Sequence, residues 1–415
     1  MTLPKVHVIG AGLAGLSAAV ELAARGRTVA VYEASPQAGG RCRSYFDSTL
    51  GMEIDNGNHL VLSGNRATLA YAARIGAGDK LVGPGAARFP FMDLATGKRW
   101  TLDANDGPVP YWMLSPKRRV PGTRLGEYLE LAKLLLAGRR ASIGGTLACK
   151  GPLWERLIEP FLVAALNIEA RQGSAALAGQ VVRETLAAGG RNYHPLVARE
   201  GLSNALVRPA LAYLEARGAP VAFGQRLKAI VFEGDRASAL DFGDARVELP
   251  PGEAVIAATP PQVTGPLLPG VSTPTEFRSI VNAHYRVDPP PGLPPITGIV
   301  GGLAQWLFAF PGRLSVTISA GDAWLDTPRE ELAARIWRDV AAVAGLSGEA
   351  PRWQIVRERR ATFAASPAQD ALRPGTLTAW RNVVLAGDWT QTGLPATIEG
   401  AIRSGVKAAQ ALPQT

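Results

Sequence analysis

The segment at residues 5–33 constrains the fold more than any other part of the chain. It reads KVHVIGAGLAGLSAAVELAARGRTVAVYE, in which a short apolar run leads into the pattern G-x-G-x-x-G at Gly10, Gly12 and Gly15. Apolar residues at helical spacing follow, and residues 28–33 form a second apolar run. This order predicts a strand, a tight turn, a helix and a parallel strand, as in a βαβ unit.

Each residue of this fingerprint has a mechanical reason to be there. Gly10 permits the tight turn, Gly12 lets a pyrophosphate approach the backbone, and Gly15 lets the helix pack closely on the strand. The start of the helix offers free N–H groups and a partial positive charge to the phosphates. Glu33 lies eighteen residues after Gly15, where its carboxylate can accept hydrogen bonds from a ribose. These residues predict dinucleotide binding rather than an unrelated glycine-rich turn.

Length and composition narrow the class of protein. The chain has 415 residues, which indicates two domains, and 47% of them are hydrophobic, as in globular proteins. Cys42 and Cys149 provide neither a disulfide framework nor metal-ligand spacing, so we expect no metal and a reducing cytoplasm. The first predicted strand starts close to Met1, so we expect no signal peptide. No apolar stretch reaches the roughly 18–20 residues that span a bilayer.

The formal net charge of +9 raises the question of an anionic partner. Basic residues are scattered and no nucleic-acid-binding motif occurs, so we expect no nucleic-acid partner. Basic residues at 117–124 and 139–140 flank an apolar predicted helix at 125–136. This arrangement suits an element that lies on an anionic membrane surface, and it suits a helix packed in the core equally well. Peripheral membrane contact and a solvated arginine-rich surface both stay open.

The residues directly after Glu33 read ASPQAGGRCRS. Gly40 permits a close backbone approach, and Arg41 presents a planar fork of donors to a phosphate. Cys42 is either a stabilised thiolate between two arginines or a small packed residue. The segment resembles the R-x-GGR extension of the flavoprotein superfamily that contains amine oxidases and phytoene desaturases, with Gln37 in place of the first arginine.

A segment near residue 57 and a second motif near the C-terminus resemble the same superfamily. Asn56-Gly57 is a turn pair after a predicted strand, in a segment that passes beside the isoalloxazine ring in that superfamily. Further on, a buried apolar strand at 383–385 precedes Gly387-Asp388, and Thr397 opens a helix. Asp388 can accept hydrogen bonds from ribityl hydroxyls or lie near the pyrophosphate, and the helix start can stabilise negative charge on a reduced flavin. The C-terminal motif and the N-terminal glycine fingerprint together predict FAD rather than NAD.

Five further segments are distinctive: DNGNHLVL at 55–62, AALN at 164–167, REGLSNALVRPA at 199–210, QWLF at 305–308 and AGDWTQTGLPATIEGAIRSG at 386–405. Through these segments the whole chain resembles the hydroxysqualene dehydroxylases, also called squalene-associated FAD-dependent desaturases, of bacterial hopanoid pathways. In that family AALN is usually followed by Thr, and here Ile168 takes that place.

The resemblance implies that reduced FAD replaces the hydroxyl group of hydroxysqualene by hydrogen, which gives squalene and water. A protonated allylic alcohol leaves as water, and a hydride can then reach the carbon, provided that the protein holds the chain and excludes solvent. We expect His59 to donate the proton, Asn167 to position the hydroxyl, and Asn58 to approach the reacting edge of the flavin. The partners implied are a polyprenyl lipid substrate and a functional link to the enzymes that form hydroxysqualene.

The resemblance also implies the fold, which is an α/β Rossmann-like FAD-binding domain of the glutathione reductase/amine oxidase type with an inserted α+β substrate domain. We expect the FAD-binding domain at residues 1–85, 200–265 and 350–415, and the substrate domain at 86–199 and 266–349. The residues expected to contact the cofactor are Gly10, Gly12, Ala14, Gly15, Glu33, Ala34, Gly40, Arg41, Gly57, Leu227, Gly387, Asp388, Thr397 and Ile398.

Other functions stay open beside this interpretation. A carotenoid-type or phytoene-type desaturase would move hydride in the opposite direction, from an allylic CH₂ to FAD. An amine oxidase usually has an aromatic cage against the flavin, and no convincing second aromatic residue lies near Trp389 in the sequence. A membrane-bound flavoprotein chaperone or a redox-inactive scaffold would hold a flavin that no polyprenyl lipid oxidises or reduces. We expect a cytoplasmic protein, with peripheral attachment to the inner membrane as the alternative.

Overall fold

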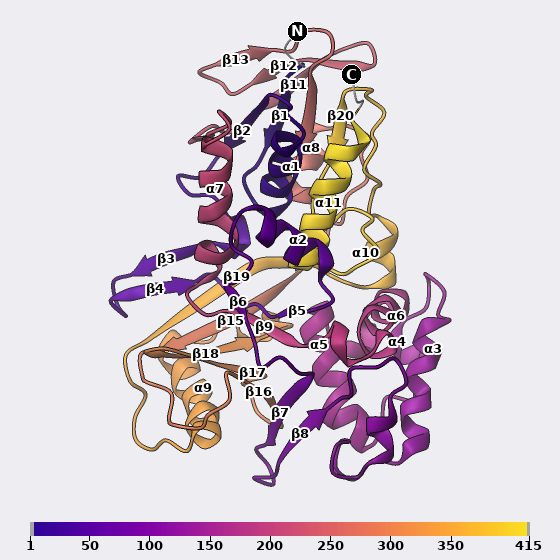
Figure 1. Cartoon of the computed structure of the whole chain (residues 1–415), viewed down its shortest axis with the longest axis vertical. Helices are drawn as coiled ribbons and strands as arrows, with labels where there is room; N and C mark the ends of the chain where they lie inside the picture. The colour runs from indigo at the N-terminus through magenta and orange to yellow at the C-terminus, as the bar shows by residue number, and fades with distance from the viewer. Residues whose placement is uncertain (1–3, 413–415) are drawn as a thin grey trace.

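A computed structural model describes residues 4–412 of the chain, which form two large sheets and three smaller ones with helices packed around them (Figure 1). The first sheet is parallel and has the strand order β10-β2-β1-β14-β20, with β1 in the centre. Its apolar central strands are buried on both faces, as expected of a parallel sheet. The strands are β1 (Val6–Ile9), β2 (Val29–Glu33), β10 (Val221–Phe223), β14 (Ala254–Ala257) and β20 (Val383–Leu385).

Helices from both ends of the chain pack together on this sheet. The predicted helix after the fingerprint is α1 (Leu13–Ala24), and the helix of the C-terminal motif is α11 (Ile398–Ala411). A Cβ atom at Gly405 would lie 2.1 Å from the carbonyl oxygen of Ala14, so glycine lets the two helices approach this closely. Further helices here are α2 (Arg66–Arg74), α7 (Arg208–Glu215), α8 (Pro261–Leu267) and α10 (Pro367–Ala371).

The second sheet has seven strands in the order β19-β15-β18-β17-β16-β7-β8. Every neighbouring pair is antiparallel except β16 and β7, which are parallel. Helix α9 (Arg329–Ala344) packs against it through a buried apolar cluster. The strands are β7 (Arg88–Asp93), β8 (Arg99–Asp103), β15 (Phe277–Tyr285), β16 (Ile296–Val300), β17 (Trp306–Phe310), β18 (Arg313–Ile318) and β19 (Trp353–Phe363).

Two short stretches lie on the other side of the predicted domain boundaries. β19 (Trp353–Phe363), which the boundary at residue 350 assigns to the FAD domain, pairs along most of its length with β15 in the second sheet. β9 (Pro195–Ala198), assigned to the substrate domain, pairs with β5 (Val61–Leu62) and β6 (Leu81–Val82). Both pairings cross the predicted boundaries, and strand pairing between distant parts of the chain leaves no local composition signal.

Small sheets and a helical region complete the described chain. The predicted helix at 125–136 is a 3₁₀ segment (Leu125–Glu130) followed by α3 (Leu131–Leu135). A π-helical turn at Trp154–Ile158 leads into α5 (Glu159–Leu166). Within residues 4–412 no helix is long and apolar enough to cross a membrane. The remaining elements are β3 (Ser44–Asp47), β4 (Met52–Asp55), β11 (Ala229–Glu233), β12 (Arg236–Asp241), β13 (Arg246–Glu248), α4 (Ile143–Thr146) and α6 (Ala175–Glu184).

Candidate active site

The turn between β1 and α1 places the three fingerprint glycines in three different surroundings. Gly10 has a φ of +105°, and a Cβ atom there would lie 2.7 Å from the carbonyl oxygen of Ala258. A Cβ atom at Gly15 would lie 1.8 Å from the carbonyl oxygen of Gly10. A Cβ atom at Gly12 would meet nothing within 4 Å. The first two glycines are therefore required by the protein itself, whereas Gly12 borders open space with room for a pyrophosphate.

Glu33, at the end of β2, lies beside this turn. Its Oε2 accepts a hydrogen bond from the N–H of Ala11 at 2.8 Å, and its Oε1 accepts one from the N–H of Ser35 at 2.8 Å. Each carboxylate oxygen keeps a further lone pair that can accept from a hydroxyl group. The N–H of Gln225 donates to the carbonyl oxygen of Glu33 at 2.8 Å, which brings the loop that carries Leu227 next to the same strand.

An ion pair joins the two predicted cofactor motifs across 347 residues of sequence. The Nη2 of Arg41 donates to both carboxylate oxygens of Asp388, at 2.7 and 2.8 Å, and its Nη1 donates to the carbonyl oxygen of Ala361. The Arg41 side chain is still 42% exposed and keeps donors for another anion. Gly39 supports this arrangement, because its N–H donates to the carbonyl oxygen of Ala11 at 2.8 Å.

The C-terminal motif forms a tight loop between β20 and α11. A Cβ atom at Gly387 would lie 2.4 Å from Nε1 of the Trp389 indole, which itself donates to the carbonyl oxygen of Thr259 at 3.0 Å. Thr397 caps α11, since its Oγ1 accepts from the N–H of Gly400 at 3.0 Å. The predicted helix at Thr397-Ile398 is thus confirmed, and its N-terminus lies at the end of the loop that carries Asp388.

Two charged residues, one holding the C-terminal loop and one joining α11 to α2, were not found by sequence reasoning. Arg373 is buried, and its guanidinium donates to the carbonyl oxygens of Asp388 at 3.2 Å and Trp389 at 3.3 Å. Glu399 is also buried and accepts from the N–H of Thr68 at 2.9 Å at the start of α2. Neither residue stands in a recognisable local pattern. For Glu399, the one sequence feature that could have indicated a role was its position as an acid in the first turn of a predicted helix.

Asn58 and His59 lie on the segment that follows the Asn56-Gly57 turn. The Nδ2 of Asn58 donates to the Val316 carbonyl and to Oγ1 of Thr317, both at 3.2 Å, so this amide attaches the segment to β18. His59 is half-buried. Burial and the positive charge of Arg41 lower the pKa of His59 to about 4, so its imidazole is neutral at pH 7. The His59 ring therefore lies within electrostatic reach of the Arg41 guanidinium.

Asn167 ends α5 in a left-handed conformation with a φ of +50°. Its Nδ2 donates to Oγ1 of Thr362 at 2.9 Å and to the carbonyl oxygen of Arg278 at 3.4 Å, while its Oδ1 accepts from the N–H of Ala320 at 2.7 Å. Both amide hydrogens are therefore already donated. The side chain joins α5 to β15 and β19. Its Oδ1 keeps one lone pair, which can accept a hydrogen bond from a substrate hydroxyl.

Cys42 is a packed thiol, which decides between the two alternatives left by the sequence. Burial raises the pKa of Cys42 to about 12, and the neighbouring Arg41 offsets only part of that effect. A thiolate at neutral pH is excluded. No group of three or more His, Cys, Asp or Glu residues within the described part of the chain could hold a metal ion.

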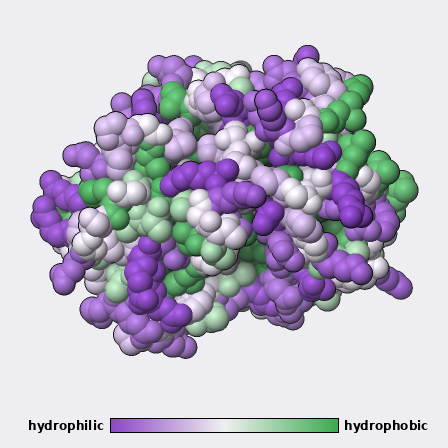
Figure 2. Space-filling view, turned by 90° about the horizontal axis from the view of Figure 1, so that it is seen from below, coloured by the Kyte–Doolittle hydropathy of each residue, from purple (hydrophilic) through white to green (hydrophobic). Residues whose placement is uncertain are grey.

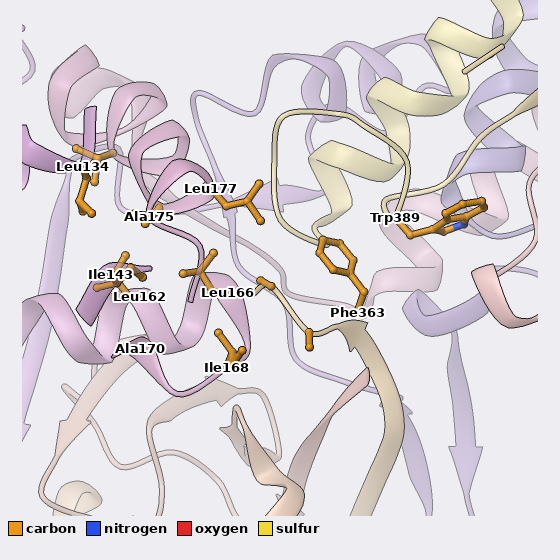
Figure 3. Close-up of a cluster of buried hydrophobic side chains, with 14 of the residues drawn as sticks. Leu134, Ile143, Leu162, Leu166, Ile168, Ala170, Ala175, Leu177, Phe363 and Trp389 are labelled. Atoms are coloured by element: carbon orange, nitrogen blue, oxygen red, sulfur yellow. The ribbon is translucent and has the colours of Figure 1, made fainter. Parts of the chain in front are cut away.

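A continuous cluster of buried apolar side chains reaches the C-terminal motif from the helical region. Figure 3 shows Leu162 and Leu166 of α5 on the helical side of this cluster, and Phe363 and Trp389 on the other side. Ile168, which replaces the Thr usual in the resembled family, belongs to the same cluster and is 1% exposed. The site therefore combines a polar frame of two glycine-bearing turns with an apolar surround that contains few groups able to bind water.

Comparisons with known proteins agree with this geometry. The family model described as flavin containing amine oxidoreductase matches residues 13–413. A hydroxysqualene dehydroxylase from Rhodopseudomonas palustris is 58% identical over 405 residues, which is 97% of each chain. One from Sinorhizobium fredii is 57% identical over 415 residues and covers 100% of both chains.

Solved structures with the same fold have diverged much further in sequence. A double mutant of putrescine oxidase has a TM-score of 0.72 and 18% identity, and the match covers 99% of both chains. Cyclohexylamine oxidase from Brevibacterium oxydans has a TM-score of 0.66 and 16% identity, over 99% of this chain and 98% of that one. The expected flavoprotein fold is thus confirmed. The chain belongs to the flavin-containing amine oxidoreductases and, within them, to the hydroxysqualene dehydroxylase family.

Proposed function

We propose that this chain binds FAD and reduces hydroxysqualene to squalene. The observation that carries the proposal is the similarity from end to end to relatives named hydroxysqualene dehydroxylase, at 57–58% identity with almost no unmatched sequence. A chain this similar over both sheets is expected to keep the substrate side of the molecule as well as the cofactor side. The proposal places the enzyme in the cytoplasm, where it takes a polyprenyl lipid from the enzymes that form hydroxysqualene.

The residues present fit a flavin dinucleotide. Gly12 borders open space at the N-terminus of α1, where free N–H groups favour phosphate. Glu33 has lone pairs left for a ribose, and Arg41 has donors left for an anion. The capped N-terminus of α11 favours negative charge on a flavin ring. The residues proposed to contact FAD are Gly10, Gly12, Ala14, Gly15, Glu33, Ala34, Gly40, Arg41, Gly57, Leu227, Gly387, Asp388, Thr397 and Ile398.

The reaction needs a hydride, a proton and a dry site. The cofactor, once bound and reduced, supplies the hydride to the carbon that loses the hydroxyl group. The carbon–oxygen bond breaks with both electrons on oxygen, one proton converts the hydroxyl to water, and a carbon–hydrogen bond replaces it. Leu162, Leu166 and Phe363 exclude bulk water from this region, which protects a carbocation-like transition state from hydration.

We propose that His59 supplies the proton. Its lowered pKa, about 4, means that the neutral imidazole is the main form at pH 7 and can donate an N–H hydrogen bond to the leaving hydroxyl. The imidazolium is the stronger acid and becomes more populated as the pH falls. Asn58 attaches the His59 segment to β18, and Asn167 contributes through its remaining Oδ1 lone pair and by joining α5 to the second sheet.

The proposal is tested by a single-turnover reaction. The purified protein is loaded with FAD, reduced with dithionite under anaerobic conditions, freed of excess reductant and mixed with hydroxysqualene in detergent. The expected result is squalene in the extract together with reappearance of the oxidised-flavin absorbance. A matched reaction mixes the oxidised protein with squalene, because a desaturase would reduce its flavin there.

Three outcomes contradict the proposal. A flavin that hydroxysqualene never reoxidises indicates a scaffold, bleaching by squalene or a carotenoid precursor indicates a desaturase, and bleaching by an amine indicates an amine oxidase. A protein that stays colourless after incubation with FAD contradicts the cofactor assignment as well.

A further inference from the structure

The segment at residues 109–140, called here the 109–140 surface, has a feature that the catalytic proposal does not use. Large apolar side chains stand out from it into solvent, with exposed fractions between 46% and 89%. The others of this kind in the described chain, such as Phe46 and Leu377, lie singly on distant elements. The apolar side chains of the 109–140 surface are Val109, Tyr111, Leu114, Leu125, Leu129 and Leu136.

The same segment carries much of the positive charge of the chain. It holds seven basic and two acidic residues, a net charge of +5 in a protein of net charge +9. Two of the basic residues are neutralised locally, because Lys133 pairs with Glu130 at 2.8 Å and Arg118 pairs with Asp103 at 3.3 Å. No ion pair within residues 4–412 involves the exposed residues Lys117, Arg139 and Arg140. Unneutralised cations therefore flank the exposed leucines.

The exposed leucines stand on a packed base. Tyr128 lies between Leu125 and Leu129 in sequence but is buried, packs edge-on against Trp112 with a centroid distance of 5.6 Å, and accepts from the N–H of Val120 at 3.1 Å. Leu134 is likewise buried at 1% exposure, two residues before the exposed Leu136. The short helical turns thus bury one apolar face and present a second apolar face to solvent, although water would favour polar residues there.

Figure 2 shows the molecule from below, with hydrophobic and hydrophilic residues interleaved toward the right of this face, the side on which α3 lies in Figure 1. Exposed apolar side chains among unpaired cations match the interface of an anionic phospholipid bilayer, where leucines enter the acyl boundary and Lys and Arg meet the phosphates. Two copies of the segment, each with a net charge of +5, would repel one another. We propose that the 109–140 surface docks this protein on an anionic lipid bilayer.

The position of the surface relative to the candidate active site supports a route for a lipid. Trp112 and Leu134, directly beneath the surface, belong to the same cluster of buried apolar side chains as Phe363 and Trp389. Figure 3 shows Leu134 at one side of this cluster and Trp389 at the other. In the proposed function, on which this step rests, a C30 hydrocarbon leaves the bilayer here and meets apolar side chains on its way to the cofactor.

The docking proposal is tested with the FAD-loaded full chain and vesicles. We expect the wild type to float with vesicles of phosphatidylcholine mixed with phosphatidylglycerol, to bind pure phosphatidylcholine much more weakly, and to be released by high salt. The triple change Leu114→Ser, Leu129→Ser and Leu136→Ser should weaken binding by about tenfold or more per leucine. Lys117→Glu with Arg139→Glu and Arg140→Glu should remove the preference for phosphatidylglycerol.

Matched controls separate docking from a general change of the surface. Phe46→Ser with Leu377→Ser removes two side chains that are 70% and 71% exposed outside this segment, and it should leave vesicle binding unchanged. All variants should keep wild-type turnover of hydroxysqualene in detergent. Vesicle binding without turnover of hydroxysqualene would support docking and refute the proposed reaction. Turnover without vesicle binding would support the proposed reaction and refute docking. Equal loss in the control, or a wild-type dimer that the leucine variant makes monomeric, would overturn docking.

Discussion

Gly12 and Gly15 lie three residues apart in one motif, yet the structure predicts that replacing each by alanine affects a different property, either protein stability or cofactor affinity. A Cβ atom at Gly15 would lie 1.8 Å from the carbonyl oxygen of Gly10, so Gly15→Ala must push α1 away from β1. A Cβ atom at Gly12 would meet nothing within 4 Å, so Gly12→Ala costs the protein itself nothing in contacts. We therefore expect Gly15→Ala to lower stability and Gly12→Ala to lower cofactor affinity alone.

The magnitudes follow from the local geometry. Gly12 has φ −71° and ψ 175°, which alanine adopts without strain. Alanine restricts the unfolded chain more than glycine does, which raises the unfolding free energy by about 0.4–1 kcal/mol. Alanine is also a poorer N-cap than glycine, which lowers the unfolding free energy, so the net change is within about 0.5 kcal/mol. The new methyl group occupies the space proposed for the pyrophosphate. Losing one charge-assisted hydrogen bond there costs roughly 1.5–3 kcal/mol, or about 10–100-fold in FAD affinity. Gly15→Ala should cost roughly 3 kcal/mol or more.

Two measurements check this pair of variants. Urea unfolding of the flavin-free proteins, followed by circular dichroism, gives the unfolding free energies, and titration with FAD gives the affinities. The reasoning is refuted if Gly12→Ala binds FAD as tightly as the wild type, or if Gly12→Ala loses as much stability as Gly15→Ala. In the first case the open space at Gly12 is not where the cofactor lies.

Three further predictions concern polar residues. His59→Ala should lower single-turnover rates by about 10²-fold with FAD still bound. Wild-type rates should rise as the pH falls from 7 toward 4, because burial and Arg41 lower the pKa of His59 to about 4. A pH profile that stays flat would exclude the imidazolium as the acid. Burial lowers the pKa of His284 to about 3, so the unfolded state takes up this proton first as the pH falls. His284 alone should therefore contribute about 2 kcal/mol to the fall in unfolding free energy between pH 6.5 and 5, measured by urea unfolding, and the fall should be smaller by about that amount in His284→Asn. Asn167→Gly keeps the left-handed backbone but removes three hydrogen bonds. The variant should therefore lose about 2–3 kcal/mol of unfolding free energy and still bind flavin. An unchanged melting curve would contradict the role of Asn167 in joining α5 to the second sheet.

Local patterns predicted much of the fold. The strand-helix-strand order of the first βαβ unit was predicted correctly, because glycine spacing, apolar runs and helical periodicity are all properties of neighbouring residues. The pairing of strands, such as that of β19 with β15, has no such local signal, because a strand carries no mark of the partner it will pair with.

The sequence alone determined that two glycine-bearing turns exist and which side chains follow each of them. Tertiary structure decided what those side chains contact. Arg41, expected to face a phosphate, also holds Asp388 from 347 residues away, and the amide of Asn167 is used between α5, β15 and β19. It also decided that Arg373 and Glu399 hold the C-terminal loop and α2, and that the leucines of 109–140 face outward. The physical reason is that periodicity and propensity act over a few residues, whereas burial, ion pairing and pKa depend on which distant groups the folded chain brings within a few ångströms.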